Sequence, residues 1–311
     1  MKFLLFAVDL VAPLLVGYLC RFQNVVKESV FNKMILNNIL VIYPTLSFLS
    51  FWVLPLHYSL IWLPVMGLAM GIIPGVIAYF VAEYKYTNDL DRGSYVMSAI
   101  LSNLGTIGGL CVFLLYGERG YAYQQLVVLF QYILMFMFCY PLAQYYYNRS
   151  QSGGAIKGVS VRSILFSRNQ LAIVGIFCGV LLNQMEVARP QSFGGLVEIL
   201  IHIGAWTALI PVGYSIDFGK LKKHYHEIRD ITIIKFMITP LAIYGIARLV
   251  IHDQIMVNTI LVLACMPTAV NAVITSRIYR LNIHISVAAF ILTTIVFLLV
   301  VYPALFVGLT I

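Results

Sequence analysis

The sequence predicts an all-helical membrane protein that crosses the bilayer ten times, in two inverted repeats of five helices each. Three observations predict this fold: the composition, ten long apolar segments, and a near-constant offset between similar positions in the two halves. Of 311 residues, 61% are hydrophobic and 10% are charged, whereas soluble domains average about 45–50% and about 25%. The solidly apolar runs favour helices over the alternating strands of a membrane barrel.

Each predicted span is an apolar run of about 20 residues, which is the length that a helix needs to cross the hydrocarbon. The ten spans are 3–20, 30–54, 58–82, 95–116, 122–147, 168–184, 193–216, 229–250, 255–277 and 284–309. We expect the first to be a membrane helix, because no small-residue cleavage site of a signal peptide follows it. The polar stretch 148–167 predicts a flexible linker between halves 1–150 and 168–311.

The distribution of Lys and Arg predicts the orientation, since cytoplasmic loops are enriched in these residues. Fifteen of the 20 lie in the loops after spans 1, 3, 5, 7 and 9: Arg21, Lys27, Lys33, Lys85, Arg92, Arg149, Lys157, Arg162, Arg168, Lys220, Lys222, Lys223, Arg229, Arg277 and Arg280. Lys235 lies inside span 8, near its basic end, where we expect its side chain to snorkel. The cytoplasmic membrane is the expected location, with both termini outside, and the net charge of +8 is explained by topology rather than by nucleic acid.

The two halves resemble one another at five pairs of positions. The pairs are Gly17 with Gly179, Pro44 with Pro211, Pro74 with Pro240, Tyr116 with Tyr279, and Tyr140-Pro141 with Tyr302-Pro303, all offset by 162 to 167 residues. Because each half holds an odd number of spans, the second half must be inserted upside down. Inverted repeats are the architecture of many secondary transporters.

Spans 4 and 9 are predicted to carry the substrate site. Span 4 holds Asn103, Gly105 and Gly108 within a stretch free of charge, and span 9 holds Pro267 and Asn271. Proline removes a backbone donor and glycine weakens a helix, so both spans are expected to break there. Two broken helices present partially positive N-termini to one point, which suits a carboxylate, and the two Asn amides are expected to face it. The absence of a carboxylate from these stretches argues against a cation exchanger.

The motifs in these spans resemble those of the auxin efflux carrier family. Asn103-Leu104-Gly105, Gly108 and Tyr116-Gly117 resemble its first crossover; Met266-Pro267, Ala269, Asn271 and Tyr279 resemble its second; Pro13 to Leu19 resembles its opening helix. Gln131 resembles a family glutamine near the site. Two positions depart from the pattern, because Leu110 and Arg280 stand where the family usually has Pro and Gly.

The resemblance implies a homodimer with the fold shared by bile acid carriers, arsenite carriers and sodium–proton antiporters. It implies a scaffold of spans 1, 2, 6 and 7 and a transport domain of spans 3–5 and 8–10. Its substrates are organic acids such as auxin, malate or malonate. On this basis the substrate-binding residues are Asn103, Gly105, Gly108, Gln131, Met266, Pro267 and Asn271.

Three ionisable residues inside spans are candidates for proton coupling, because charge in hydrocarbon is costly and usually functional. They are Asp9 in span 1 and the i, i+4 pair Glu198 and His202 in span 7, which share a helix face. A structural pair near the headgroups is the alternative reading.

The predicted function is a carrier of small organic anions, and three alternatives stay open. They are a sodium-coupled symporter of the bile acid type, a channel, and a membrane-embedded enzyme. The sequence contains no nucleotide-binding, nucleophile-elbow or His-rich metal motif, and the five Cys have no metal-ligand spacing, so we expect neither a cofactor nor a metal.

Overall fold

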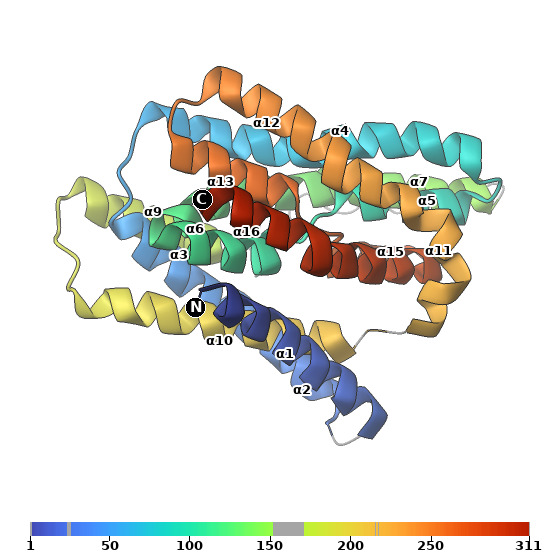
Figure 1. Ribbon diagram of the computed structural model, residues 1–311, viewed down its shortest axis with the longest axis horizontal. Helices are drawn as coiled ribbons and strands as arrows, with labels where there is room; N and C mark the ends of the chain where they lie inside the picture. The colour runs from blue at the N-terminus through green and yellow to red at the C-terminus, as the bar shows by residue number, and fades with distance from the viewer. Residues whose placement is uncertain (1, 24–25, 152–170, 215, 217, 311) are drawn as a thin grey trace. The chain divides into compact units, whose positions relative to one another are not determined.

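A computed structural model describes residues 2–23, 26–151, 171–214, 216 and 218–310, and this part of the chain is almost entirely helical (Figure 1). Six of the described helical segments are long and apolar enough to cross a membrane. They are Ser29–Trp52, Tyr58–Lys85, Leu104–Ser150, Ser192–Tyr214, His224–Val250 and Ile283–Leu309. Leu171–Gln184 and Gln254–Ala264 are shorter apolar helices. The architecture is that of a polytopic membrane protein.

The helices before the predicted linker, whose residues 152–167 lie outside the described part of the chain, belong to the first half. They are α1 (Lys2–Gln23), α2 (Glu28–Asn37), η1 (Asn38–Ile42), α3 (Tyr43–Trp52), η2 (Tyr58–Ile61), α4 (Trp62–Lys85), α5 (Asp89–Ile100), η3 (Leu104–Gly108), α6 (Gly109–Leu134), η4 (Met135–Cys139) and α7 (Tyr140–Ser150). Within α6, Gly117 is non-helical (φ 63°, ψ −153°), so predicted spans 4 and 5 meet at a sharp turn.

The described part of the second half is also built from helices. Its helices are α9 (Leu171–Gln184), α10 (Ser192–Tyr214), α11 (Phe218–Ile233), η6 (Ile234–Ile238), α12 (Thr239–Val250), α13 (Gln254–Ala264), α14 (Val270–Ile278), α15 (Ile283–Val296), η7 (Phe297–Val301) and α16 (Tyr302–Thr310). The span predicted at 255–277 is therefore two helices, α13 and α14, separated by non-helical residues.

Four short π-helical turns (η1, η4, η6 and η7) share one cause. Each is followed by an α-helix whose second residue is Pro: Pro44, Pro141, Pro240 and Pro303. At each turn the residue before the proline donates its N–H to the carbonyl five residues earlier. Proline cannot donate and its ring displaces the carbonyl four residues before it, so the ladder widens by one residue.

The π-helical turns show which of the matched positions in the two halves share local structure. Tyr140-Pro141 and Tyr302-Pro303 have the same local backbone, each following a π-helical turn. Pro211 and Pro74 instead lie inside regular α-helices. The matches of Pro44 with Pro211 and of Pro74 with Pro240 are therefore not matches of local structure.

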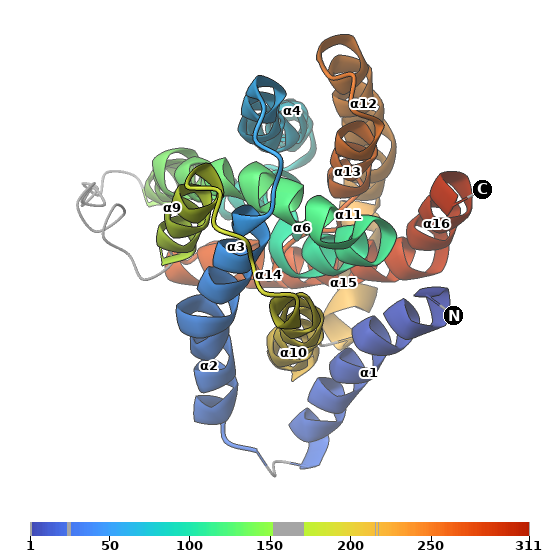
Figure 2. The ribbon, with the colours of Figure 1, turned by 90° about the vertical axis from the view of Figure 1, so that its left-hand side faces the viewer.

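One compact unit is built from α1, α2, α3, α9 and α10 together with residues Gly105–Gln125. Its main contacts are α1 with α10 and α3 with α9, and Figure 2 shows these helices. A methyl group on Gly17 would collide with the carbonyl of Ile210, and one on Gly179 with the carbonyl of Phe48. Phe48 and Ile210 are 162 residues apart, as are Gly17 and Gly179. The same glycine contact therefore occurs in both helix pairs.

The second compact unit is built from α4, α5, α7 and α11 to α16, together with Leu126–Leu134 of α6. Its core is formed where α5 packs on α4, α7 and α15, and where α11 packs on α15. Small residues allow close approach, since a methyl group on Gly67 of α4 would collide with the carbonyl of Val127. Each unit draws helices from both halves of the chain.

Candidate functional site

Two helix breaks meet within the second unit. Leu101–Asn103 separates α5 from η3, and Cys265–Ala269 separates α13 from α14. The two extended segments pair antiparallel: Asn103 N–H donates to Pro267 O at 2.8 Å, and Ala269 N–H donates to Leu101 O at 2.8 Å. Backbone groups released from the helices thus satisfy one another, as they must in a low-dielectric environment. We call these paired segments the crossover bridge.

The crossover bridge leaves the start of one helix without a side-chain cap. α14 begins at Val270, and its N-cap residue Ala269 offers no side-chain hydrogen bond. The first N–H groups of a helix have no partner within it and carry partial positive charge. An anion beside this end would therefore be stabilised.

Ser102, in the middle of the crossover bridge, is held by two side chains from other helices. Gln131 of α6 donates from Nε2 to Ser102 O at 2.7 Å. Lys235 of η6 donates from Nζ to Ser102 Oγ at 2.8 Å. Gln131, which resembles a family glutamine near the site, thus lies beside the first break.

Lys235 is the most unusual residue of the site. Lys235 is 1% exposed, and it donates a hydrogen bond to the neutral hydroxyl of Ser102. Within the described part of the chain, Lys235 has no carboxylate at ion-pair distance. A buried ammonium without a counter-charge is costly. The expectation that Lys235 snorkels to the membrane surface is wrong, because η6 directs its side chain to Ser102 instead.

The second strand of the crossover bridge is held by threonines. Thr268 Oγ1 donates to Ser98 O at 2.9 Å, and Thr268 N–H donates to Thr293 Oγ1 at 3.0 Å. All three residues are buried. Sequence reasoning missed Ser98 and Thr293, although both are hydroxyl residues inside apolar spans and could have been noticed for that reason.

The predicted residues of spans 4 and 9 take different positions around the bridge. Asn103 is its last residue on the first strand and is 8% exposed, while Met266 and Pro267 lie in the second break and Met266 is fully buried. Asn271 is the second residue of α14 and is exposed, with its C=O accepting from Thr275 Oγ1 at 2.7 Å.

Gly105 and Gly108 lie after the first break, in η3, rather than at the gap itself. The expectation that glycine opens span 4 is therefore wrong, because the ladder ends at Ile100 and the extended residues are Leu101–Asn103. In the first unit, Gly105 lines a cavity of about 20 Å³ with Tyr43 and Thr106. That volume has room for about one water molecule and not for an organic solute.

The ionisable candidates pair differently from the expected i, i+4 arrangement. His202 Nδ1 lies 2.6 Å from Asp9 Oδ2, and Trp206 Nε1 donates to Asp9 Oδ1 at 2.9 Å. Asp9 is buried, whereas Glu198 is exposed. The partner of His202 is thus a residue of α1, not its neighbour Glu198 on α10. These contacts join α1 to α10 beside the glycine contacts of the first unit.

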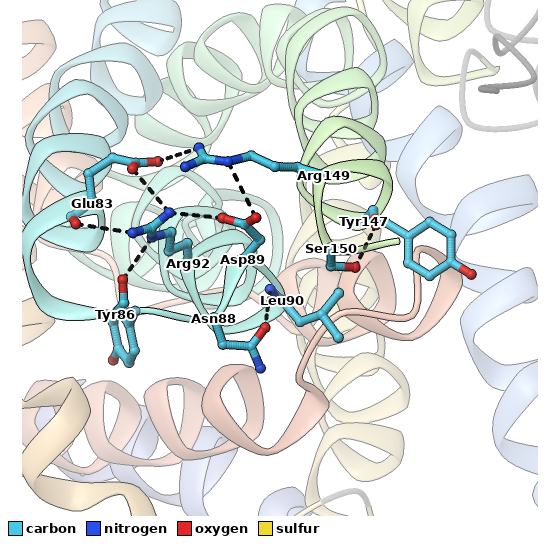
Figure 3. A network of polar contacts seen from close by, with 9 residues as sticks. All are labelled: Glu83, Tyr86, Asn88, Asp89, Leu90, Arg92, Tyr147, Arg149 and Ser150. Atoms are coloured by element: carbon cyan, nitrogen blue, oxygen red, sulfur yellow. Dashed lines mark hydrogen bonds and ion pairs between the residues drawn. The ribbon is translucent and has the colours of Figure 1, made fainter. Parts of the chain in front are cut away.

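A closed ionic network joins the ends of α4, α5 and α7 (Figure 3). Arg92 lies 3.2 Å from Glu83 and 2.9 Å from Asp89. Arg149 lies 3.1 Å from Glu83 and 3.3 Å from Asp89. Two guanidinium groups and two carboxylates balance one another, so this network fixes helix ends and offers no free charge to a ligand.

Comparison with known proteins gives one informative relative. No family model matches the chain. The chain is 23% identical over 297 residues to a protein of Methanocaldococcus jannaschii described as an uncharacterized transporter, and the match covers 92% of each chain. The similarity extends over both compact units. A transporter-like membrane protein is therefore the description that the relative and the helices support together.

Proposed function

We propose that this protein is a secondary transporter of small organic anions and that the crossover bridge lies at its substrate site. The observation that carries the proposal is the buried ammonium of Lys235 beside two interrupted helices. A buried amine without a carboxylate partner in the described residues favours an anionic ligand over a cation, because an anion stabilises its protonated form. Broken helices at mid-membrane are the usual substrate sites of carriers built from inverted repeats.

A carboxylate at this site has three complementary groups. Lys235 supplies charge, the uncapped start of α14 supplies backbone N–H groups, and the Asn103 amide supplies a neutral donor. Hydrogen bonds to charged groups contribute about 1.5–3 kcal/mol each. Because no carboxylate of the described residues lies at ion-pair distance from Lys235, the substrate itself would supply the negative charge that pairs with its protonated form.

Alternating access and membership of the auxin efflux carrier family form the second part of the proposal. The repeated glycine contact of Gly17 and Gly179 and the shared backbone before Pro141 and Pro303 support an internal repeat. The helices of the two compact units largely follow the scaffold and transport grouping that the resemblance implies, apart from Gly105–Gln125. We expect a homodimer in the cytoplasmic membrane that carries mono- or dicarboxylates.

Counterflow in proteoliposomes tests the function. Vesicles loaded with unlabelled malate or malonate should accumulate the labelled acid faster than empty vesicles, because a carrier is accelerated by substrate on the opposite side. Equal rates in loaded and empty vesicles would indicate a channel. Replacing sodium by potassium should not change the rate; loss of uptake without sodium would favour the symporter of the bile acid type.

Reporter fusions test the orientation. A reporter active only in the cytoplasm should be active when fused after Gln151 and silent when fused after Ile311. The opposite result would reverse the proposed orientation in the membrane. It would not affect the proposal that the protein is a carrier.

Asp9 and His202 are the proposed site of proton coupling. Asp9→Asn should abolish the response of transport to an imposed pH gradient, because the buried carboxylate partner of His202 is lost. Glu198→Gln is the matched control, since Glu198 is exposed on the same helix as His202. An unchanged response in Asp9→Asn would assign the pair a structural role.

A further inference from the structure

An open groove of about 990 Å³ lies in the second unit, beside the C-terminal end of α4 and on α11. The lining residues that matter here are Phe80, Tyr84, Lys85, His226, Arg229 and Asp230. α4 ends at Lys85, and the apolar segment His224–Val250, to which most of α11 belongs, begins at His224. The groove therefore lies where two candidate membrane spans end, which is the level of lipid headgroups.

The groove carries excess positive charge. Lys85 Nζ lies 2.8 Å and 2.9 Å from the two carboxylate oxygens of Asp230, so these two charges compensate one another. Arg229 is exposed and has no ion pair within the described part of the chain. The neighbouring Arg92 and Arg149 are matched by carboxylates, as Figure 3 shows. Among the described residues that line the groove, Arg229 is thus a cation without a carboxylate partner, and His226 lines the groove with it.

Aromatic side chains also line the groove, and they are strongly exposed. The Tyr84 side chain is 97% exposed and that of Phe80 is 68% exposed. Aromatic rings are enriched where protein meets the membrane interface, because one part of the ring is apolar and the other tolerates water. A ligand with an anionic head and an apolar body would match both the cation and the rings.

We propose that this groove binds the phosphate of an anionic phospholipid headgroup. Arg229 supplies a forked guanidinium that suits phosphate oxygens, and His226 supplies a further donor. Phe80 and Tyr84 lie against the glycerol and upper acyl region. Basic pockets at the ends of membrane helices on the cytoplasmic side recognise lipid headgroups in this way. The proposal does not depend on which solute the protein carries.

The test compares soluble lipids on the detergent-purified protein. Dioctanoyl phosphatidylglycerol, dioctanoyl phosphatidylcholine and inorganic phosphate are titrated separately, and binding is followed by the rise in unfolding temperature. We expect phosphatidylglycerol to bind at least fivefold more tightly than phosphatidylcholine, and phosphate to give no shift at the same concentrations. A shift with phosphate alone equal to that with phosphatidylglycerol would overturn the lipid assignment in favour of a free anion.

Two matched variants locate the site. Arg229→Gln should weaken phosphatidylglycerol binding by about tenfold, the loss expected for a hydrogen bond to a charged group. Arg277→Gln removes an exposed guanidinium in α14, outside the groove, and should change binding by less than about twofold. Equal losses in the two variants would mean that diffuse surface charge, and not this groove, attracts the lipid.

Discussion

The break between α5 and η3 and the break between α13 and α14 differ in what holds them open. The first contains no proline, and its Ser102 is fixed by Gln131 and Lys235. The second contains Pro267, and its Thr268 is fixed by Ser98 and Thr293. Both breaks reach the same extended pairing. A membrane helix can therefore be interrupted by a residue that lacks a donor, or by side chains elsewhere that take over the released groups.

The two breaks also differ in the charge of the groups that support them. The supports of the second break are neutral, namely the backbone carbonyl of Ser98 and the hydroxyl of Thr293, whereas one support of the first is the amine of Lys235. A neutral donor could hold the Ser102 hydroxyl as well as an ammonium can, and without the cost of burying a charge. The proposed anionic substrate would account for Lys235 at the first break, and the following predictions test this difference.

The largest expected effect is on transport by Lys235→Met. Methionine keeps the length and apolar stem of the side chain but removes its charge, so the protein should fold while malate or malonate counterflow falls by about 10- to 150-fold. Lys33→Met is the control, because Lys33 is exposed and its loss should leave the rate within about twofold. Unchanged transport in Lys235→Met would mean that the charge of Lys235 takes no part in substrate binding.

Ser102→Ala should lower stability by about 1–3 kcal/mol, because it leaves the Lys235 ammonium buried without its hydroxyl partner. Thr268→Val should cost about 1 kcal/mol, since it removes a neutral hydrogen bond. Thermal unfolding in detergent measures both. In the double variant Ser102→Ala with Lys235→Met, part of the loss should be recovered, as the orphaned charge is gone. Strictly additive losses would contradict the assigned contact.

Pro267→Ala should reduce turnover by less than about tenfold, which is a smaller effect than that of Lys235→Met. The bridge bonds of Asn103 and Ala269 remain available in this variant, and the first break shows that proline is not required. Counterflow rates measure the effect, with the exposed Leu299→Ala as the control. A loss as severe as that of Lys235→Met would show that proline, rather than pairing, keeps the second break open.

The last predictions concern stability at the turns that follow the two breaks, where no effect on transport is expected. Gly117 and Arg280 lie 163 residues apart, like Tyr116 and Tyr279, and both have positive φ, 63° and 54°. Gly117→Ala should destabilise by about 1–3 kcal/mol, because its backbone region is nearly restricted to glycine. Arg280→Gly should be neutral or stabilise by up to about 1 kcal/mol, since it relieves a left-handed arginine. The unfolding temperatures of the two variants measure both effects. A clearly lower unfolding temperature in Arg280→Gly would mean that the arginine side chain itself stabilises the protein.

The sequence alone predicted the membrane class and the break in span 9. Apolar runs and Pro267 act locally, through burial of apolar surface and the missing backbone donor, so they can be read from neighbouring residues. Arg280, noted in the sequence as a departure from the pattern of the resembled family, has a positive φ of 54°. The repeat of ten spans, the homodimer and the substrate remain predictions.

Only the tertiary structure decided the exact first break and its partners. The glycines of span 4 suggested the wrong position, because Leu101–Asn103 is extended through pairing with residues about 166 positions away. The same holds for Lys235, whose side chain meets Ser102 of the first break, and for His202, whose partner lies on α1 and not on its own helix. Contacts between distant segments depend on how the helices pack, and local propensity carries no information about that packing.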